Sequence, residues 1–167
     1  MTPPTAPDSA KTDPAVTNDL VIHRVLQAPR AAIWRAWSDP SLLPAWWCPK
    51  PWATEVLAFE LRPGGAFHTL MRGPDGGRSD NPGSFVDVQP QARIVFTSML
   101  LPGWRPATPW MPFTAVIEMA DEGAGTRYTA TVMHPDAATR DRHHEMGFYD
   151  GWNLCIDQLD AFALTLR

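Results

Sequence analysis

The chain has 167 residues, of which 44% are hydrophobic and 19% charged, so it is long and apolar enough to bury the core of one domain. Its net charge of −4 argues against nucleic acid or an anionic membrane as the main partner, because both bind basic surfaces. Eight tryptophans stand beside only two tyrosines. Since each buried indole N–H needs a hydrogen-bond partner, so many tryptophans predict a large aromatic-lined interior.

The N-terminal segment, residues 1–18, is rich in Pro, Thr, Ala and Asp, a composition that predicts a flexible tail. An arm that docks on a neighbouring subunit is the alternative. The segment lacks the features of a signal peptide, and no apolar run in the chain approaches the ~20 residues of a transmembrane helix. Cys48 and Cys155 are too few for a disulfide scaffold. We therefore expect a cytoplasmic protein that does not insert into a membrane.

The first third of the chain predicts one strand and two short helices. Residues 20–27 are rich in β-branched side chains, which favour a strand. Ala28-Pro29 then begins a helix, with proline in the first turn, and this helix stops at Ser38. Asp39 followed by proline is a typical start signal and predicts a second short helix that ends at Trp46-Trp47.

The middle of the chain alternates polar and apolar residues with period two between turn signals, a pattern typical of antiparallel strands. A long connection, residues 101–112, interrupts this series with four prolines and two tryptophans. It is too apolar for an exposed hairpin loop, so we expect an ordered flap. The six predicted strands are 55–61, 66–72, 83–89, 93–100, 113–120 and 126–134.

The C-terminal part predicts a long helix. Asp136 is a suitable N-cap, and apolar residues recur at helical spacing from Tyr149 to Leu166. A continuous helix from Arg140 to Leu166 would extend ~40 Å, enough to cross a curved sheet. The order β-α-α-β6-α therefore predicts an α+β fold in which the helix lies on one face of an antiparallel sheet.

A set of short motifs, in this order, gives the chain a family resemblance over about nine tenths of its length, from Leu20 to Leu166. The chain resembles the SRPBCC (START-like, Bet v-like) superfamily, and within it the Aha-like branch, which is related to the activator of the heat-shock chaperone ATPase. The motifs are Ala28-Pro29-Arg30, Ile33-Trp34-Arg35-Ala36-Trp37, Asp39-Pro40, Trp46-Trp47, Pro49-Lys50, Leu61-Arg62-Pro63-Gly64-Gly65, Met71-Arg72-Gly73-Pro74-Asp75-Gly76, Met146-Gly147-Phe148 and Gly151-Trp152.

This resemblance implies a helix-grip fold, in which a strongly curved sheet wraps the C-terminal helix and leaves a cavity between them. It also implies that residues 19–167 form a single START-like domain. The superfamily contains lipid and hormone carriers, polyketide cyclases and chaperone co-activators. Because one fold serves all of these functions, the resemblance does not select a chemistry.

Candidate ligand-binding residues follow from where apolar side chains would meet such a cavity. On the strand 66–72, Phe67 and Met71 share the more apolar face, and we expect that face to point inward, opposite His68 and Arg72. Plain structural packing is the alternative for every tryptophan. The candidates are Trp46, Trp47, Phe67, Met71, Trp104, Trp110, His144, Met146 and Trp152.

Metal and cofactor motifs have no support in the sequence. His143-His144-Glu145 looks metal-like, but adjacent helical side chains point about 100° apart and cannot chelate one ion together. Ser79-Asp80-Asn81 matches one element of penicillin-binding enzymes without its Ser-x-x-Lys partner, so we interpret it as a coincidence in a loop. We expect neither a metal nor a cofactor.

Three functions remain open. The first, which we favour, is the binding of a small hydrophobic or aromatic molecule in the cavity. The second is an enzyme of the polyketide cyclase or aromatase kind, with His68 or His144 and Arg72 relaying protons. The third is a co-chaperone-like interaction module. A homodimer is compatible with each of them, and no catalytic residue is assigned.

Overall fold

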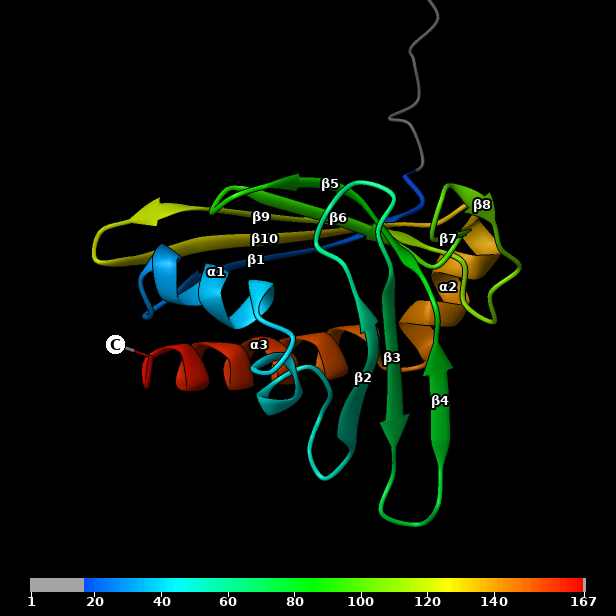
Figure 1. The fold of residues 1–167 in the computed structure, drawn as a ribbon, viewed down its shortest axis with the longest axis horizontal. Coiled ribbons are helices and arrows are strands. Elements are labelled where there is room, and N and C mark those ends of the chain that lie inside the picture. Colours follow the sequence, from blue (N-terminus) through cyan, green and yellow to red (C-terminus); the bar gives the residue numbers. More distant parts are fainter. Residues whose placement is uncertain (1–16, 167) are drawn as a thin grey trace, which may run out of the picture.

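A curved antiparallel sheet wraps around the C-terminal helix in the computed structural model, which describes residues 17–166 (Figure 1). This confirms the predicted α+β helix-grip fold. Residues 1–16 of the predicted tail lie outside the described residues. The elements are β1 Asp19–Leu26, α1 Arg30–Ser38, the 3-10 helix η1 Leu43–Ala45, β2 Ala53–Phe59, β3 Phe67–Arg72, β4 Arg78–Asn81, β5 Ser84–Gln89, β6 Arg93–Thr97, β7 Leu100–Leu101, β8 Arg105–Pro106, β9 Thr114–Glu122, β10 Gly125–Met133, α2 Ala137–Glu145 and α3 Phe148–Ala163.

The sheet has a five-stranded part in the order β1-β10-β9-β6-β5 and a three-stranded part in the order β2-β3-β4. A bridge between Ala66 and Ser84 connects the two parts. Two register shifts, between Val56 and Ala58 and between Phe85 and Asp87, bend the strands. Because of this bend, β2, β3 and β4 descend past α3 while the larger part of the sheet covers it (Figure 1).

Alternation along the strands places one face of the large sheet in the core. On β10, Tyr128, Ala130 and Val132 are buried, and on β9 Ala115 and Ile117 are buried with them. Helix α1 presents its buried side to this face, and α3 completes the core. One face of the sheet thus packs against two helices. The period-two pattern predicts this, because it places the apolar side chains of each strand on a single face.

Helix α3 is fixed to the first strand and to the turn after it by polar contacts. Asp160 accepts hydrogen bonds from the backbone N–H groups of Gln27 and Ala28, at 3.0 and 2.8 Å. Arg24 on β1 forms an ion pair with Asp157, with N and O atoms 2.6 Å apart. Asp160 is therefore a structural anchor, because a carboxylate satisfies two backbone donors that the end of β1 leaves open.

Three details of the predicted elements are wrong. The C-terminal helix is not continuous, because the chain turns at Gly147, whose φ of 91° is left-handed, and α3 begins only at Phe148. With 16 residues, α3 extends about 24 Å rather than 40 Å. The second helix is reduced to the single turn η1, which contains Pro44.

The strand series is longer than predicted. Ser79-Asp80-Asn81 lies in β4, paired with β3, and not in a loop. The flap is ordered, as predicted, and contains a small hairpin of β7 and β8. Asp136 is the N-cap of α2, where its side chain accepts from the backbone N–H of Thr139. The sequence therefore predicts the N-cap of α2 correctly, whereas the prediction of a loop at residues 79–81 is wrong.

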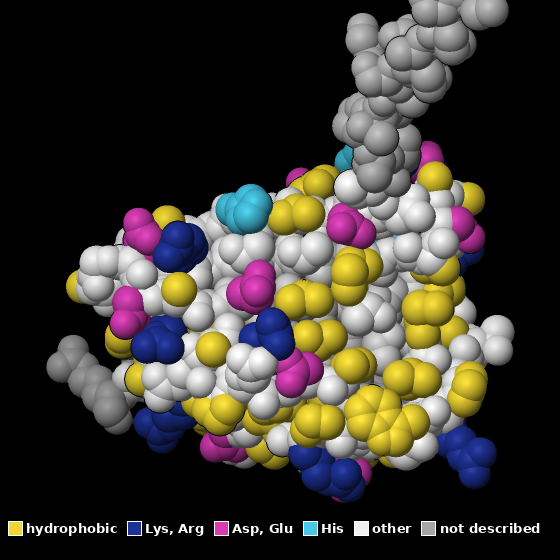
Figure 2. Space-filling model, turned by 90° about the horizontal axis from the view of Figure 1, so that it is seen from above, with side chains coloured by type: hydrophobic (Ala, Val, Ile, Leu, Met, Phe, Trp, Pro, Cys, Tyr) yellow, Lys and Arg dark blue, Asp and Glu magenta, His cyan; other side chains and the backbone are white. Residues whose placement is uncertain are grey.

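The outer face of the large sheet carries hydrophobic, charged and histidine side chains side by side, without a broad area of one charge (Figure 2). Such a face lacks the basic stripe that nucleic-acid binding requires. Among residues 17–166, no helix has both the length and the apolar character needed to span a membrane.

Candidate ligand-binding cavity

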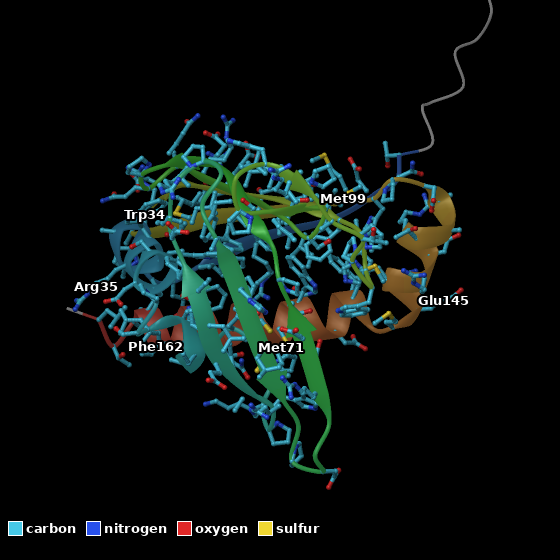
Figure 3. All side chains as sticks on the ribbon, turned by 45° about the vertical axis from the view of Figure 1, so that its right-hand side comes forward. Trp34, Arg35, Met71, Met99, Glu145 and Phe162 are labelled. Atoms are coloured by element: carbon cyan, nitrogen blue, oxygen red, sulfur yellow. The ribbon has the colours of Figure 1, made fainter. Side chains whose placement is uncertain are left out.

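A cavity of about 470 Å³ lies between the curved sheet and α3. Its walls come from β3, β4, β6 and β10 on the sheet side, and from α1, α2, α3 and the segment after η1 on the other side. Figure 3 places Met71, one of the lining residues, on the three-stranded part of the sheet, near the middle of the molecule, with Trp34 and Phe162 on one side of it and Glu145 on the other. The helix-grip topology therefore creates the space that the resemblance implies.

Aromatic rings form the deep part of the cavity. The ring of Trp47 makes edge contacts with Trp37 and Phe67, with ring centroids 5.1 Å apart in both pairs. Phe96 lies 5.2 Å from Phe67, also edge to face. These T-shaped arrangements are the ones that aromatic quadrupoles favour. The packed rings form a rigid apolar surface against which a flat hydrophobic molecule can lie.

Tyr128 and Trp37 place one hydrogen bond within this apolar wall. The indole Nε1–H of Trp37 donates to the Tyr128 hydroxyl at 2.9 Å. Burial raises the pKa of Tyr128 far above its ordinary value, so the phenol stays neutral. Its own O–H has no acceptor among the described residues.

The rim of the cavity is formed by exposed lining residues on β4 and on the flap. Trp110 is 54% exposed, and its Nε1–H donates to the Asn81 side-chain oxygen at 3.2 Å. A guanidinium N–H of Arg142 on α2 donates to the Trp110 carbonyl at 2.9 Å. Two elements far apart in the sequence thus hold the Trp110 indole over the entrance.

Gln158 on α3 fixes the segment that carries Trp46 and Trp47. Its amide donates to the carbonyls of Trp46 and Cys48, at 3.1 and 2.9 Å, and its oxygen accepts from the N–H of Lys50 at 3.1 Å. One side chain therefore replaces the backbone hydrogen bonds that this irregular segment lacks.

Cys155 is a second side chain of α3 that contacts this segment. Its thiol donates to the carbonyl of Trp47, with S and O 3.6 Å apart. Burial, with a smaller contribution from Cys48 nearby, raises the pKa of the Cys155 thiol to about 12. Cys155 is therefore an inert part of the wall, as its apolar surroundings in the sequence predict.

A pair of histidines forms the polar end of the cavity. His143 of α2 lines it, and its Nδ1 lies 2.8 Å from Nε2 of His134. Nδ1 of His134 lies in turn 2.8 Å from the carbonyl oxygen of Asn18. Burial, the proximity of His134 and that of Arg142 lower the pKa of His143 to about 4, so His143 is neutral near pH 7.

Six of the nine predicted ligand-binding residues line the cavity together. Phe67 and Met71 point inward with Thr69 between them, which agrees with the strand face that the sequence favours. Trp46 is only 2% exposed and is part of the core as well as of the cavity wall. The six are Trp46, Trp47, Phe67, Met71, Trp110 and Trp152.

Three predicted site residues do not line the cavity. Trp104 is 53% exposed and lies on the outer surface against Gly64, where a Cβ atom would come within 2.9 Å of the indole. His144 is exposed on α2, and its ring lies edge to face with Tyr149. Met146 is 56% exposed where α2 ends. The errors on α2 have one cause, since the break at Gly147 changes which helix face meets the cavity.

The sequence prediction missed Trp37, Phe96, Tyr128 and His143 as lining residues. In the sequence, Trp37 belongs to a predicted helix and Tyr128 to a predicted strand, and no local pattern marks either as a cavity residue. His143 is not among the predicted ligand-binding residues, which include its neighbour His144 instead. The spacing of His134 and His143 is not a helical one, and only the turn between β10 and α2 brings the two rings together.

The fold and this cavity define a helix-grip protein with a mainly apolar site that is rich in aromatic side chains and open at one rim. Residues 27–163 match the family described as activator of Hsp90 ATPase homolog 1-like protein. The chain belongs to this family, as the motif resemblance predicted. A comparison with curated proteins finds no match.

Solved structures of bacterial proteins share the fold. A protein from Nitrosomonas europaea is 41% identical, with a TM-score of 0.83 over 88% of this chain and 94% of that one. A protein from Mycobacterium smegmatis is 26% identical, with a TM-score of 0.76 over 90% of this chain and 94% of that one. The AHSA1 protein from Silicibacter pomeroyi is 20% identical, with a TM-score of 0.66 over 89% and 99%, and its likeness concerns the fold alone.

Proposed function

We propose that the protein binds a small hydrophobic or aromatic molecule in the cavity between the sheet and α3. The observation that carries this proposal is an aromatic-walled space of about 470 Å³, large enough for a compound of two or three fused rings. Protein interiors are otherwise packed with few voids larger than a water molecule. A space of this size, lined by Trp47, Phe67 and Phe96, favours a resident ligand over simple packing.

Gly151 of α3 gives a sharp test, because it lines the cavity without filling it. A Cβ atom placed there would meet only the Pro49 ring, at 3.9 Å. Gly151→Leu therefore projects a side chain into the cavity while keeping the helix. The control, Gly151→Ala, adds one methyl group and should stabilise α3 by about 1 kcal/mol.

The measurement is a calorimetric titration of each variant with naphthalene and 2-naphthol. We expect wild type and Gly151→Ala to bind, and Gly151→Leu to bind at least about tenfold more weakly. Wild-type protein that binds neither compound would contradict the proposal. Equal binding by Gly151→Leu and wild type would place the binding outside the cavity and contradict it as well.

His143 favours a second candidate, a cyclase-like enzyme, because a buried histidine on a cavity wall can exchange a proton with a bound molecule. Its pKa of about 4 makes it a weak base at pH 7, which argues for hydrogen bonding rather than proton abstraction. The test is incubation with a linear poly-β-ketone. A dehydrated cyclic product detected by mass spectrometry, and lost in His143→Phe, would support the enzyme.

The third candidate, a co-chaperone-like interaction module, rests on the family's name and on the motif resemblance. It predicts capture of an Hsp90-type ATPase by the immobilised protein and a change in the rate of ATP hydrolysis. Absence of both effects would remove this candidate while leaving the cavity proposal intact.

A further inference from the structure

The contact between His134 and Asn18 fixes which ring nitrogens carry protons. A backbone carbonyl can only accept a hydrogen bond, so Nδ1 of His134 must carry the proton that it donates to Asn18. In neutral His134, Nε2 is then a bare lone pair, and it can pair with His143 only if Nδ1 of His143 is the donor. Neutral His143 consequently has no proton on its Nε2.

The Nε2 atom of His143 is within reach of the cavity. His143 forms part of the wall, and the rings of Phe113 and Phe148 contact it at centroid distances of 5.6 and 5.0 Å. Nε2 has no hydrogen-bond partner in the part of the chain that the structure describes. Among the described residues, the polar side-chain atoms that are both fully enclosed and without a partner are Trp47 Nε1 and Thr54 Oγ1. His143 Nε2 also lacks a partner, but it is not fully enclosed. Open space therefore touches this lone pair.

The other polar side chains of the inner wall have partners or can donate, and the unpartnered Nε1–H of Trp47 is fully enclosed. Thr97 and Ser98 donate to the carbonyls of Phe113 and Met111, at 2.9 and 2.7 Å. The hydroxyls of Thr69 and Tyr128 face the cavity too, but Tyr128 already accepts from Trp37 and is left to donate, and the Thr69 hydroxyl can rotate to either role. Neutral His143 is thus the one inner side chain among the described residues that can only accept, because the Asp80 carboxylate lies at the exposed rim and pairs with His68.

We propose that His143 Nε2 is a fixed hydrogen-bond acceptor in the cavity wall, and that the ligand is an apolar ring compound carrying a neutral hydroxyl group. This inference rests on the proposed function, and it names the class of molecule that the site takes. An O–H donor satisfies the lone pair. A matched ether leaves the Nε2 lone pair without a hydrogen-bond donor. A carboxylate places a negatively charged oxygen next to that lone pair in apolar surroundings, which weakens binding further.

The first experiment is independent of any ligand. Long-range ¹H–¹⁵N correlation spectra of the imidazole rings at pH 7 report which nitrogen of each histidine is protonated. We expect protonated Nδ1 and bare Nε2 on His143. A protonated Nε2 on His143 would overturn the inference and would leave the proposed function standing.

The second experiment compares 2-naphthol with 2-methoxynaphthalene and 2-naphthoate by calorimetric titration at pH 7. We expect 2-naphthol to bind about tenfold more tightly than the ether, with the carboxylate weakest. Equal affinity for the alcohol and the ether overturns the inference while binding itself supports the proposed function. Failure of all three compounds and of naphthalene to bind overturns both.

Variants assign the preference to a residue. His143→Phe should bind the ether as well as wild type does but lose the tenfold preference for the alcohol, whereas His144→Ala, on the outer face, should keep it. Thr69→Val tests whether the Thr69 hydroxyl causes the preference instead. If Thr69→Val loses the preference for the alcohol and His143→Phe keeps it, the assignment to His143 is overturned. His134 is a positioning residue, because it fixes the tautomer of His143. In His134→Phe, the same spectra should therefore show both tautomers of His143.

Discussion

The Nε1–H of Trp37 donates to the hydroxyl of Tyr128 at 2.9 Å, and both side chains are almost completely buried. This bond joins α1 to β10, two elements that are 91 residues apart at the contact. It also places a neutral hydrogen-bonded pair among the aromatic rings of the cavity wall. The structure of the cavity and the stability of the fold are therefore linked at this point.

Tyr128→Phe removes the only acceptor that the Trp37 indole has in the described part of the chain. We expect a loss of about 1–3 kcal/mol in the free energy of unfolding, because a buried donor is left without a partner. Urea denaturation measures the loss. In Trp37→Phe the same tyrosine substitution should cost much less, and an equal cost in both backgrounds would show that the bond does not contribute.

Trp110 and Trp104 form a matched pair, since they are equally exposed but only Trp110 lines the cavity. Trp110→Ala should weaken the binding of 2-naphthol about three- to tenfold, mainly through faster dissociation, because the entrance loses its cover. Trp104→Ala should leave binding unchanged. Stopped-flow tryptophan fluorescence measures the dissociation rate, and equal effects of the two substitutions would contradict the role of Trp110 at the entrance.

The lowered pKa of His143 predicts that stability falls with acid. In the unfolded chain this imidazole binds a proton near its ordinary pKa of 6.5, whereas in the fold it stays neutral until about pH 4. The unfolded state therefore holds more protons between these values, and the stabilisation, up to about 3 kcal/mol, is complete above pH 6.5 and is lost as the pH falls towards 4.

Urea denaturation at several pH values tests this dependence. His143→Gln should flatten the curve between pH 4 and 6.5, whereas His144→Gln should not. Asp136 lies beside this site, and hydrogen bonds from Thr139 lower its pKa, so Asp136 contributes to the slope that remains at the acid end. Arg142 stays charged throughout this range. A curve that His143→Gln leaves unchanged would contradict a buried neutral His143.

Gln158→Leu removes three hydrogen bonds from the segment that carries Trp46 and Trp47. We expect a loss of about 1–2 kcal/mol in the free energy of unfolding, together with weaker binding, because the aromatic wall is no longer fixed to α3. Asp150→Asn, at an exposed position of the same helix, is the control. Hydrogen exchange of the Lys50 amide should rise in Gln158→Leu alone.

The sequence predicts the fold well because its signals are local. Period-two alternation, turn residues and the N-cap at Asp136 each concern a few neighbouring residues, and together with the motifs they determine the helix-grip topology. The inward face of β3 follows from the same alternation. Six lining residues could be found in this way from apolar character and position.

The remaining site depends on long-range geometry that local patterns do not carry. The His134–His143 contact needs the turn after β10, and the exclusion of His144 and Met146 needs the break at Gly147. Gln158 and Asp160 look like ordinary exposed residues of an amphipathic helix. Their roles appear only when the partners, backbone groups of two distant segments, are in place.

A crystal structure of the protein with 6-bromo-2-naphthol shows whether the cavity binds a hydroxylated ring, because the bromine gives an anomalous signal that locates the ring. We expect a bromine peak inside the cavity among Trp47, Phe67 and Phe96, with the naphthol oxygen about 2.8 Å from Nε2 of His143. A saturated crystal with no bromine peak in the cavity, or with bromine only on the outer surface, would contradict it.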